Sequence, residues 1–262
     1  MHFIKLLFYS VFLFSFFSCA SSDLSKKNGL QEDSMFLTLE QEVGWGRAID
    51  EEIQREYVLF KDEGIKEKVS EIGNHLVSFS ERKNLKYTFR ILYTDEVNAF
   101  AVPGGFIYIT TGLLDRIENI DELSCVLGHE IVHVASGHSV NQLKTITLAG
   151  RGLNLLKLGA IIMGSPSVAL MAADFLTFLW MKGYSRGHEE EADTYGTIYS
   201  FKSGYDPKKS IDLFKRMKEE EKKYHKENNV FENYLRTHPS FEKRIANIEK
   251  VIDKLEENKE IN

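Results

Sequence analysis

The chain of 262 residues contains only two cysteines, Cys19 and Cys125. If Cys19 is lipidated, as its surroundings suggest below, no intramolecular disulfide can form. Cys125 is flanked by leucine and valine residues, and we interpret it as a buried apolar side chain rather than a nucleophile or metal ligand. A chain of this length can bury a full core without covalent cross-links.

Positive charge is not in excess either. The 33 lysines and arginines are outnumbered by 39 aspartates and glutamates, which gives a formal net charge of −6 and argues against nucleic acid as the main partner. Hydrophobic residues make up 43% and charged residues 27%, values that exclude a disordered or fibrous protein. We find no internal repeat, and the length suits one or two domains.

Long uninterrupted apolar runs are also missing. The run at 6–17 follows Lys5 and is too short for a mature transmembrane helix, so we interpret residues 1–18 as a signal peptide. A small residue followed by Cys19 resembles a bacterial lipoprotein signal, in which the cysteine becomes the lipidated first residue. Phe16 departs from the usual leucine, and an ordinary secretory signal is the alternative. The prediction is a periplasmic protein with a lipid anchor at Cys19.

A second apolar stretch spans residues 148–181, but only 158–173 is free of charge and 164–167 interrupts it with glycine, serine and proline. We therefore favour two helices packed over the functional site to a membrane span. A membrane-embedded helix over 153–181 is the alternative. No acidic residue directly follows Cys19, which favours the outer membrane as the site of the anchor.

The remaining pattern predicts an α+β domain, mainly α, over residues 37–262. The polar segment 19–36 is typical of a flexible tether. Apolar residues at helical spacing predict two helices between 37 and 83. Alternation near 87–93, with short extended runs at 98–102 and 106–111, predicts a small antiparallel sheet. Further helices are expected at four places: from the N-cap Asp121 to about Gly137, 189–201, 208–227 and 241–255.

The chain's clearest chemical motif is His129-Glu130-Ile131-Val132-His133. Histidines four residues apart share one helix face, so both imidazoles can bind one metal ion. Glu130 can then reach a water on that ion. This is the zinc-peptidase pattern, in which the ion polarises a carbonyl and acidifies the water whose proton the glutamate accepts. Two helix histidines that only satisfy local hydrogen bonds are the alternative.

The motif needs a third ligand. His138 lies five residues after His133, which rotates it off the ligand face, and we place it beside the site or on the surface. The stretch from Ser185 to Asp193 contains three adjacent glutamates on a separate segment. Chemistry alone does not choose among them. If the first, Glu189, binds metal, Asp193 shares its face and can hydrogen-bond a ligand histidine.

The two motifs together resemble a known family of zinc metallopeptidases, which includes the CAAX prenyl endopeptidase, mitochondrial Oma and the bacterial peptidases BepA and LoiP. The short tether and the lack of an added repeat domain are most similar to the compact periplasmic lipoprotein members. The matching segments, in family order, are Asn98-Ala99-Phe100-Ala101-x-Pro103-Gly104-Gly105, Gly112-Leu113-Leu114, His129-Glu130-x-x-His133, Ser185-Arg186-x-x-Glu189-x-x-Ala192-Asp193, Thr237-His238-Pro239 and Arg244-Ile245.

This resemblance implies a zincin-like fold with one Zn²⁺ per chain, in which Glu189 is the third ligand after His129 and His133. It implies that the stretch made of Asn98, Ala99, Phe100, Ala101 and Val102 is an edge strand along which a substrate backbone lies. It also implies that His238 partners the attacking water or the oxyanion. Arg244 would support that loop or the acidic residues of the site.

The resulting hypothesis is a zinc-dependent endopeptidase that cleaves misfolded or misassembled proteins of the bacterial cell envelope, with Glu130 as general base. The alternative is a chaperone or assembly factor for envelope proteins, with the metal site latent or gated.

Overall fold

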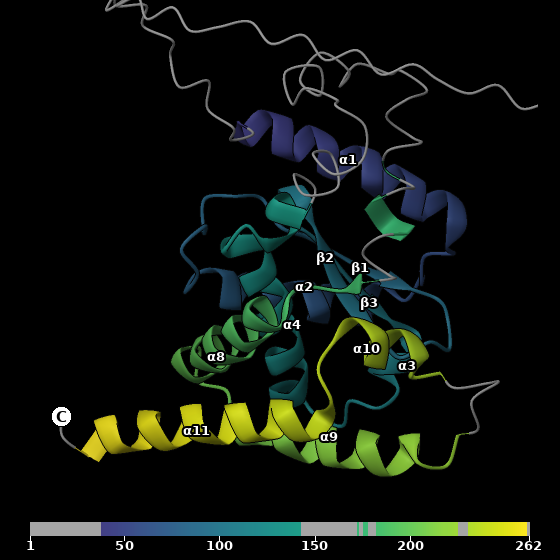
Figure 1. The fold of residues 1–262 in the computed structure, drawn as a ribbon. Helices are drawn as coiled ribbons and strands as arrows, with labels where there is room; N and C mark the ends of the chain where they lie inside the picture. Colours follow the sequence, from purple (N-terminus) through teal and green to yellow (C-terminus); the bar gives the residue numbers. More distant parts are fainter. Residues whose placement is uncertain (1–37, 143–171, 173–174, 178–181, 225–229, 261–262) are drawn as a thin grey trace, which may run out of the picture. The chain divides into compact units, whose positions relative to one another are not determined.

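The computed structural model describes residues 38–142, 172, 175–177, 182–224 and 230–260 (Figure 1). All of them belong to the unit Met35–Asn262. The predicted signal peptide, Cys19 and the predicted tether at 19–36 lie outside the described residues, as does most of 148–181. No helix in the described part of the chain is both long enough and apolar enough to cross a membrane.

Two helices open the described chain, as predicted. Helix α1 (Leu39–Glu56) begins at a capping box in which Thr38 and Gln41 satisfy each other's backbone N–H groups. Helix α2 (Glu63–Val77) is capped by the side chain of Asp62. Each helix buries one apolar stripe, and α2 packs against the sheet and against the helix that carries the histidine motif.

The sheet is mixed rather than antiparallel, so that part of the prediction was wrong. Its strands β1 (Thr88–Leu92), β2 (Ala99–Val102) and β3 (Phe106–Thr110) lie in the order β1-β3-β2. A tight turn, η1 (Pro103–Gly105), joins β2 and β3 as an antiparallel pair, whereas β1 pairs with β3 in parallel. All five residues of β3 are buried, so this strand takes the centre and leaves β2 at an edge.

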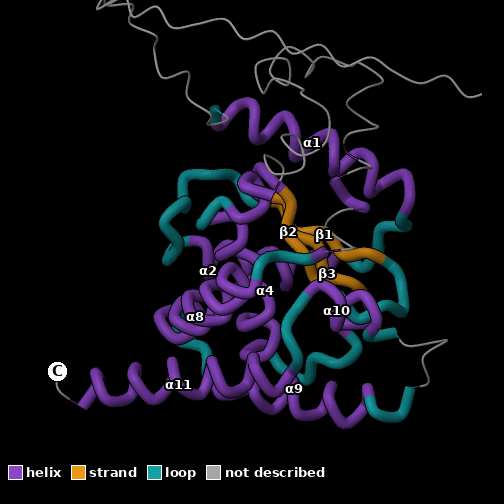
Figure 2. Tube along the Cα trace, in the orientation of Figure 1, coloured by secondary structure: helices purple, strands orange, loops and turns teal. Residues whose placement is uncertain are grey.

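Helix α4 (Ile120–Ala135) carries the histidine motif and lies at the centre of the described fold (Figures 1 and 2). It follows the short helix α3 (Thr111–Leu114) and packs against β2, α2 and α8. Its N-cap is Asn119 rather than Asp121, because the Asn119 side chain accepts the N–H of Glu122.

Four more helices complete the described domain: α8 (Arg186–Lys202), α9 (Lys208–Glu221), α10 (Glu232–Thr237) and α11 (Phe241–Glu260). Helix α8 lies along α4, and α11 packs against both α8 and α9 (Figure 1). Periodicity predicted α8, α9 and α11 with different ends and missed α10, which has only six residues. Figure 2 shows the small sheet beside α4, with α8 and α10 among the neighbouring helices.

Candidate metal centre

The Nε2 atoms of the two motif histidines point towards each other. His129 and His133 are one turn apart on α4, and their Nε2 atoms are 3.1 Å apart. Both side chains are buried, with at most 2% of their surface exposed. Each Nδ1 atom faces away from this point and bonds another residue. In this arrangement both imidazoles can bind the same metal ion through Nε2.

Glu189 completes the group from the neighbouring helix. Its two carboxylate oxygens lie 3.4 Å from the Nε2 atoms of His129 and His133 respectively. The approach depends on Gly196, because a Cβ there would lie 2.7 Å from the backbone nitrogen of His129. A glycine on α8 therefore lets its backbone come close to α4, and the first turn of α8 delivers Glu189 to the histidines.

These three side chains suit a metal ion. One potential ligand atom from each lies within 4.8 Å of the others, and all three are buried. Within the described residues, Glu189 Oε1 has no hydrogen-bond partner although it is buried. Two imidazoles and one carboxylate form a donor set that binds zinc and leaves a fourth position open.

His129 is oriented by a buried acid and its counter-ion. Its Nδ1 lies 2.9 Å from Asp193 Oδ1, and the guanidinium of Arg244 donates to the same carboxylate. Arg244 also donates to the hydroxyl of Tyr234. Burial and Arg244 act to lower the pKa of His129, but the bonds to Asp193 and Glu189 raise it to about 9. Asp193 thus fixes the ring, and Arg244 balances the buried charge.

His133 is oriented by another histidine. Its Nδ1 lies 2.9 Å from Nδ1 of His138, which is 2% exposed. The other nitrogen of His138 lies 3.5 Å from Glu191, whose second oxygen accepts the Ser136 hydroxyl. Burial, with His133 nearby, lowers the pKa of His138 to about 4. A neutral His138 can accept the Nδ1 proton of His133 and direct its own proton towards Glu191.

Replacement of His138 with leucine is expected to weaken zinc binding by roughly 10–100-fold, the usual cost of losing such an outer partner. Leucine keeps a branched shape but offers no acceptor for the His133 proton. His138→Asn restores an oxygen near the position of Nδ1 and should retain most of the affinity. A competition titration against a chromophoric zinc chelator measures both constants. Tighter binding by the leucine variant than by the asparagine variant would show that His138 serves packing alone.

The side chains of Glu130 and His238 line the same small cavity. A space of about 20 Å³, enough for about one water, is lined by both residues together with Ala99 of β2. Burial raises the pKa of Glu130, and its Oε2 has no hydrogen-bond partner among the described residues. His238 lies between α10 and α11, and its Nδ1 is 2.8 Å from Glu189 Oε2. A free acceptor and an imidazole therefore face the same void.

Tyr184 closes the site from the side of β2. Its ring stacks on His133 with centroids 3.8 Å apart and planes 15° apart, and its hydroxyl donates to the carbonyl of Ala101 at 2.9 Å. Gly183 places it there with a positive φ of 60°, at a point where a Cβ would lie 2.1 Å from the Thr237 carbonyl oxygen. A chain that pairs with this edge of β2 has to displace the tyrosine.

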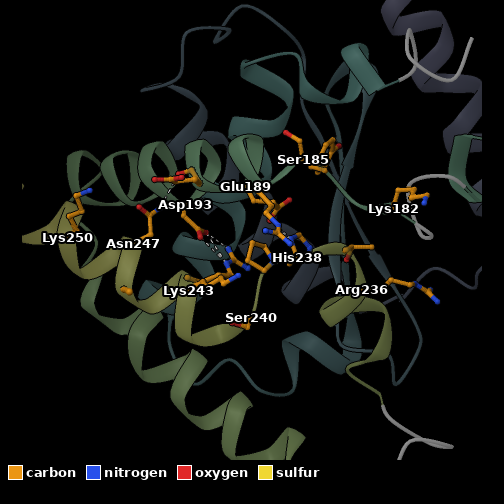
Figure 3. A pocket seen from close by; sticks show the side chains of 17 residues that line it. Lys182, Ser185, Glu189, Asp193, Arg236, His238, Ser240, Lys243, Asn247 and Lys250 are labelled. Atoms are coloured by element: carbon orange, nitrogen blue, oxygen red, sulfur yellow. Dashed lines mark hydrogen bonds and ion pairs between the residues drawn. The ribbon is translucent and has the colours of Figure 1, made fainter. Parts of the chain in front are cut away.

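An open cleft of about 880 Å³ lies on the other side of Tyr184 and His238. Figure 3 shows Glu189 and His238 in the middle of this cleft, with Lys182 and Arg236 to one side. The opposite side is lined by residues of α11, among them Lys243, Asn247 and Lys250 (Figure 3). Glu189 therefore lies in the wall of the cleft, although only 1% of its surface is exposed.

The structure brings together most of the residues that the sequence singled out: His129, Glu130, His133, Glu189, Asp193, His238 and Arg244. Of the predicted substrate strand, Ala99 lines the Glu130 cavity, whereas Phe100 stacks on Tyr108 on the other face. Tyr184 was missed because no motif marks it. The sequence does not decide whether His138 lies beside the site or on the surface, and the structure places it against His133.

The chain is similar in sequence to known peptidases. The family model "Peptidase family M48" matches residues 65–252. The beta-barrel assembly-enhancing protease of Yersinia pestis is 26% identical over 80% of this chain and 43% of its own length. The human mitochondrial metalloendopeptidase OMA1 is 27% identical over 74% of this chain and 39% of its own. The Saccharomyces cerevisiae mitochondrial metalloendopeptidase OMA1 is 31% identical over 63% and 46%. The chain thus spans less than half the length of these relatives.

Proposed function

Because the chain belongs to peptidase family M48, we propose that it is a zinc-dependent endopeptidase that cleaves proteins. The observation that carries this proposal is the buried group of His129, His133 and Glu189 beside a carboxylate oxygen of Glu130 that has no hydrogen-bond partner among the described residues. Relatives named as metalloendopeptidases support the same class of activity. One zinc ion per chain would polarise the scissile carbonyl and acidify a water.

The protein's own residues divide the remaining work. Glu130 accepts the proton of the attacking water and later delivers it to the leaving amine nitrogen. Burial raises the pKa of Glu130, which makes its carboxylate a stronger base than an exposed glutamate. His238 lines the same cavity, and its Nδ1 donates to the Glu189 carboxylate, so its Nε2 can donate to the developing negative charge on the carbonyl oxygen only when the ring carries both protons. Asp193 and His138 hold the imidazole rings in orientation.

The substrate backbone is proposed to pair with β2. The carbonyl of Asn98 accepts the N–H of Thr110, so the alternation of an antiparallel ladder turns the backbone groups of Ala99 and Ala101 towards the open edge. Ala99 also lines the cavity at Glu130. Pairing through main-chain groups would bring a peptide bond to the site with little dependence on its side chains.

Loss of the Tyr184 hydroxyl is expected to speed cleavage. A substrate that pairs with β2 must break the bond from this hydroxyl to Ala101. Such a bond contributes about 0.5–1.5 kcal/mol, so Tyr184→Phe should raise kcat/KM roughly two- to tenfold while the ring stack on His133 and the zinc affinity are kept. Progress curves with a fluorogenic peptide measure the ratio. A lower kcat/KM would instead assign the hydroxyl to catalysis.

We also propose that the enzyme acts in the bacterial cell envelope, anchored to the outer membrane by a lipid on Cys19. The support is the lipoprotein-like sequence around Cys19 and the similarity to beta-barrel assembly-enhancing proteases. Metabolic labelling with a fatty acid should mark the wild-type protein and not Cys19→Ser. Labelling of both proteins, or of neither, would refute the anchor and leave the peptidase proposal untouched.

The rival function is that of a chaperone or assembly factor with a latent site. The observation that favours it is the enclosure of Glu130, which is 2% exposed and faces a void that holds about one water. Incubation with unfolded casein, followed by mass spectrometry of the products, separates the two functions. Internal cleavage that stops on zinc chelation supports the endopeptidase. Suppressed aggregation of casein without any new fragments would favour the chaperone.

A further inference from the structure

The cleft beside the metal centre has a charge opposite to that of the whole chain. Its exposed charged side chains include one carboxylate, Glu190, whereas the chain carries a net charge of −6. Five exposed cations line the same cleft: Lys182, Arg186, Arg236, Lys243 and Lys250. The other charged groups of the lining, Glu189, Asp193 and Arg244, are buried and bonded to one another or to the histidines.

Most of these cations have no acidic partner among the described residues. Arg236 pairs with Glu232, but no ion pair in the described part of the chain involves Lys182, Arg186, Lys243 or Lys250. The amino-terminal turns of α8 and α11 open on the same cleft, and their backbone N–H groups add positive potential. A concave surface with one sign of charge attracts ligands of the other sign.

The cations lie on both sides of the metal centre. In Figure 3, Lys182 and Arg236 are on one side of Glu189 and His238, and Lys243 and Lys250 are on the other. A polypeptide that passes the site would therefore meet positive charge in both directions. The volume of about 880 Å³ is large enough for several side chains.

We propose that this cleft binds acidic segments of the polypeptide substrate, so that the enzyme prefers peptide bonds flanked by aspartate and glutamate. This proposal rests on the peptidase function, and it concerns which substrates the enzyme binds and at which surface. Main-chain pairing with β2 gives the enzyme little sequence preference. The cationic side chains add a preference for acidic residues through their charge. The attraction is between exposed groups and therefore falls as salt screens it.

Binding can be measured separately from cleavage. The probes are three fluorescent peptides of equal length and identical apart from four positions, which carry aspartate and glutamate, asparagine and glutamine, or lysine. Fluorescence anisotropy with zinc-loaded Glu130→Gln should show tightest binding of the acidic peptide and weaker binding at 0.5 M than at 0.05 M salt. Equal binding of the acidic and amide peptides would overturn the proposal.

Variants with reversed charge test whether the cleft causes the preference for acidic peptides. Lys243→Glu with Lys250→Glu, introduced into the wild-type enzyme, should raise KM for the acidic peptide on the order of tenfold, since each exposed charge pair is worth a few-fold. The kcat and the zinc content should not change. The matched control is Lys83→Glu with Lys86→Glu, two exposed lysines before β1 that do not line the cleft. An equal rise in KM in both double variants would overturn the proposal.

Two further outcomes are distinguishable. If the acidic peptide binds preferentially but no peptide is cleaved, the inference about the cleft stands and the proposed peptidase function fails. The second outcome is that vesicles of phosphatidylglycerol bind the wild-type protein but not the Lys243→Glu, Lys250→Glu variant, and that none of the three peptides displaces them. The cleft would then bind a membrane surface, and the proposal would be wrong.

Discussion

Glu130→Gln should reduce cleavage of casein by about 10²–10⁴-fold, the usual contribution of a general base, while the protein still binds one zinc ion. Glutamine has nearly the shape of glutamate but cannot accept the proton of the attacking water. Because Glu130 is buried and its Oε2 has no partner among the described residues, no other side chain depends on its charge for a hydrogen bond at that oxygen. The fold is therefore expected to persist.

The measurement combines a single-turnover cleavage assay with metal analysis of the same sample. Glu67→Gln is the matched control, because it removes one carboxylate from an exposed position on α2. Cleavage by Glu130→Gln at the wild-type rate would mean that the proton is taken elsewhere, and the proposed role of this residue would be lost. Loss of zinc along with activity would mean that Glu130 supports the metal centre rather than the proton transfer.

Glu189→Ala is expected to lose zinc. The change removes one of the three proposed ligands and the only carboxylate of that group, so the affinity should fall by well over the roughly 10–100-fold that an outer partner is worth. Zinc per chain should drop from one to near zero after dialysis. Glu190→Ala provides the control, since the next side chain along α8 is exposed and lies outside the ligand group.

The comparison of these two variants is sharp because they are neighbours on one helix. Both remove a carboxylate from the first turns of α8, so both change the helix propensity and the helix dipole in similar ways. Only Glu189 lies within 3.4 Å of both Nε2 atoms. Equal zinc content in the two variants would contradict the ligand assignment, and loss of zinc from Glu190→Ala alone would transfer the role to Glu190.

The three proposed ligands differ in how far the sequence alone could predict them. His129 and His133 are four residues apart, so helical geometry alone places them on one face. Glu189 comes 56 residues after His133, and chemistry could not separate it from the two glutamates that follow. The choice depended on the resemblance to a family, and the close approach of α8 to α4 at Gly196 supplies its physical basis.

For the sheet too, the sequence alone could predict some features and not others. Alternation of apolar residues predicted the first strand, and the short extended runs on either side of the turn at 103–105 predicted the other two. Strand order depends on which strand can be buried on both sides, and that is settled only by the packing around β3. Tyr184 lies beyond sequence analysis for the same reason. Its stack on His133 and its bond to Ala101 join three segments that are remote along the chain.

The most direct test of the central claim is a titration of metal-free protein with Zn²⁺ while casein cleavage is followed. The site of His129, His133 and Glu189 predicts that activity is absent without metal, rises in proportion to added zinc and reaches its maximum at one ion per chain. Cleavage that is unaffected by removal of the metal, or the absence of cleavage at every zinc concentration, would contradict it.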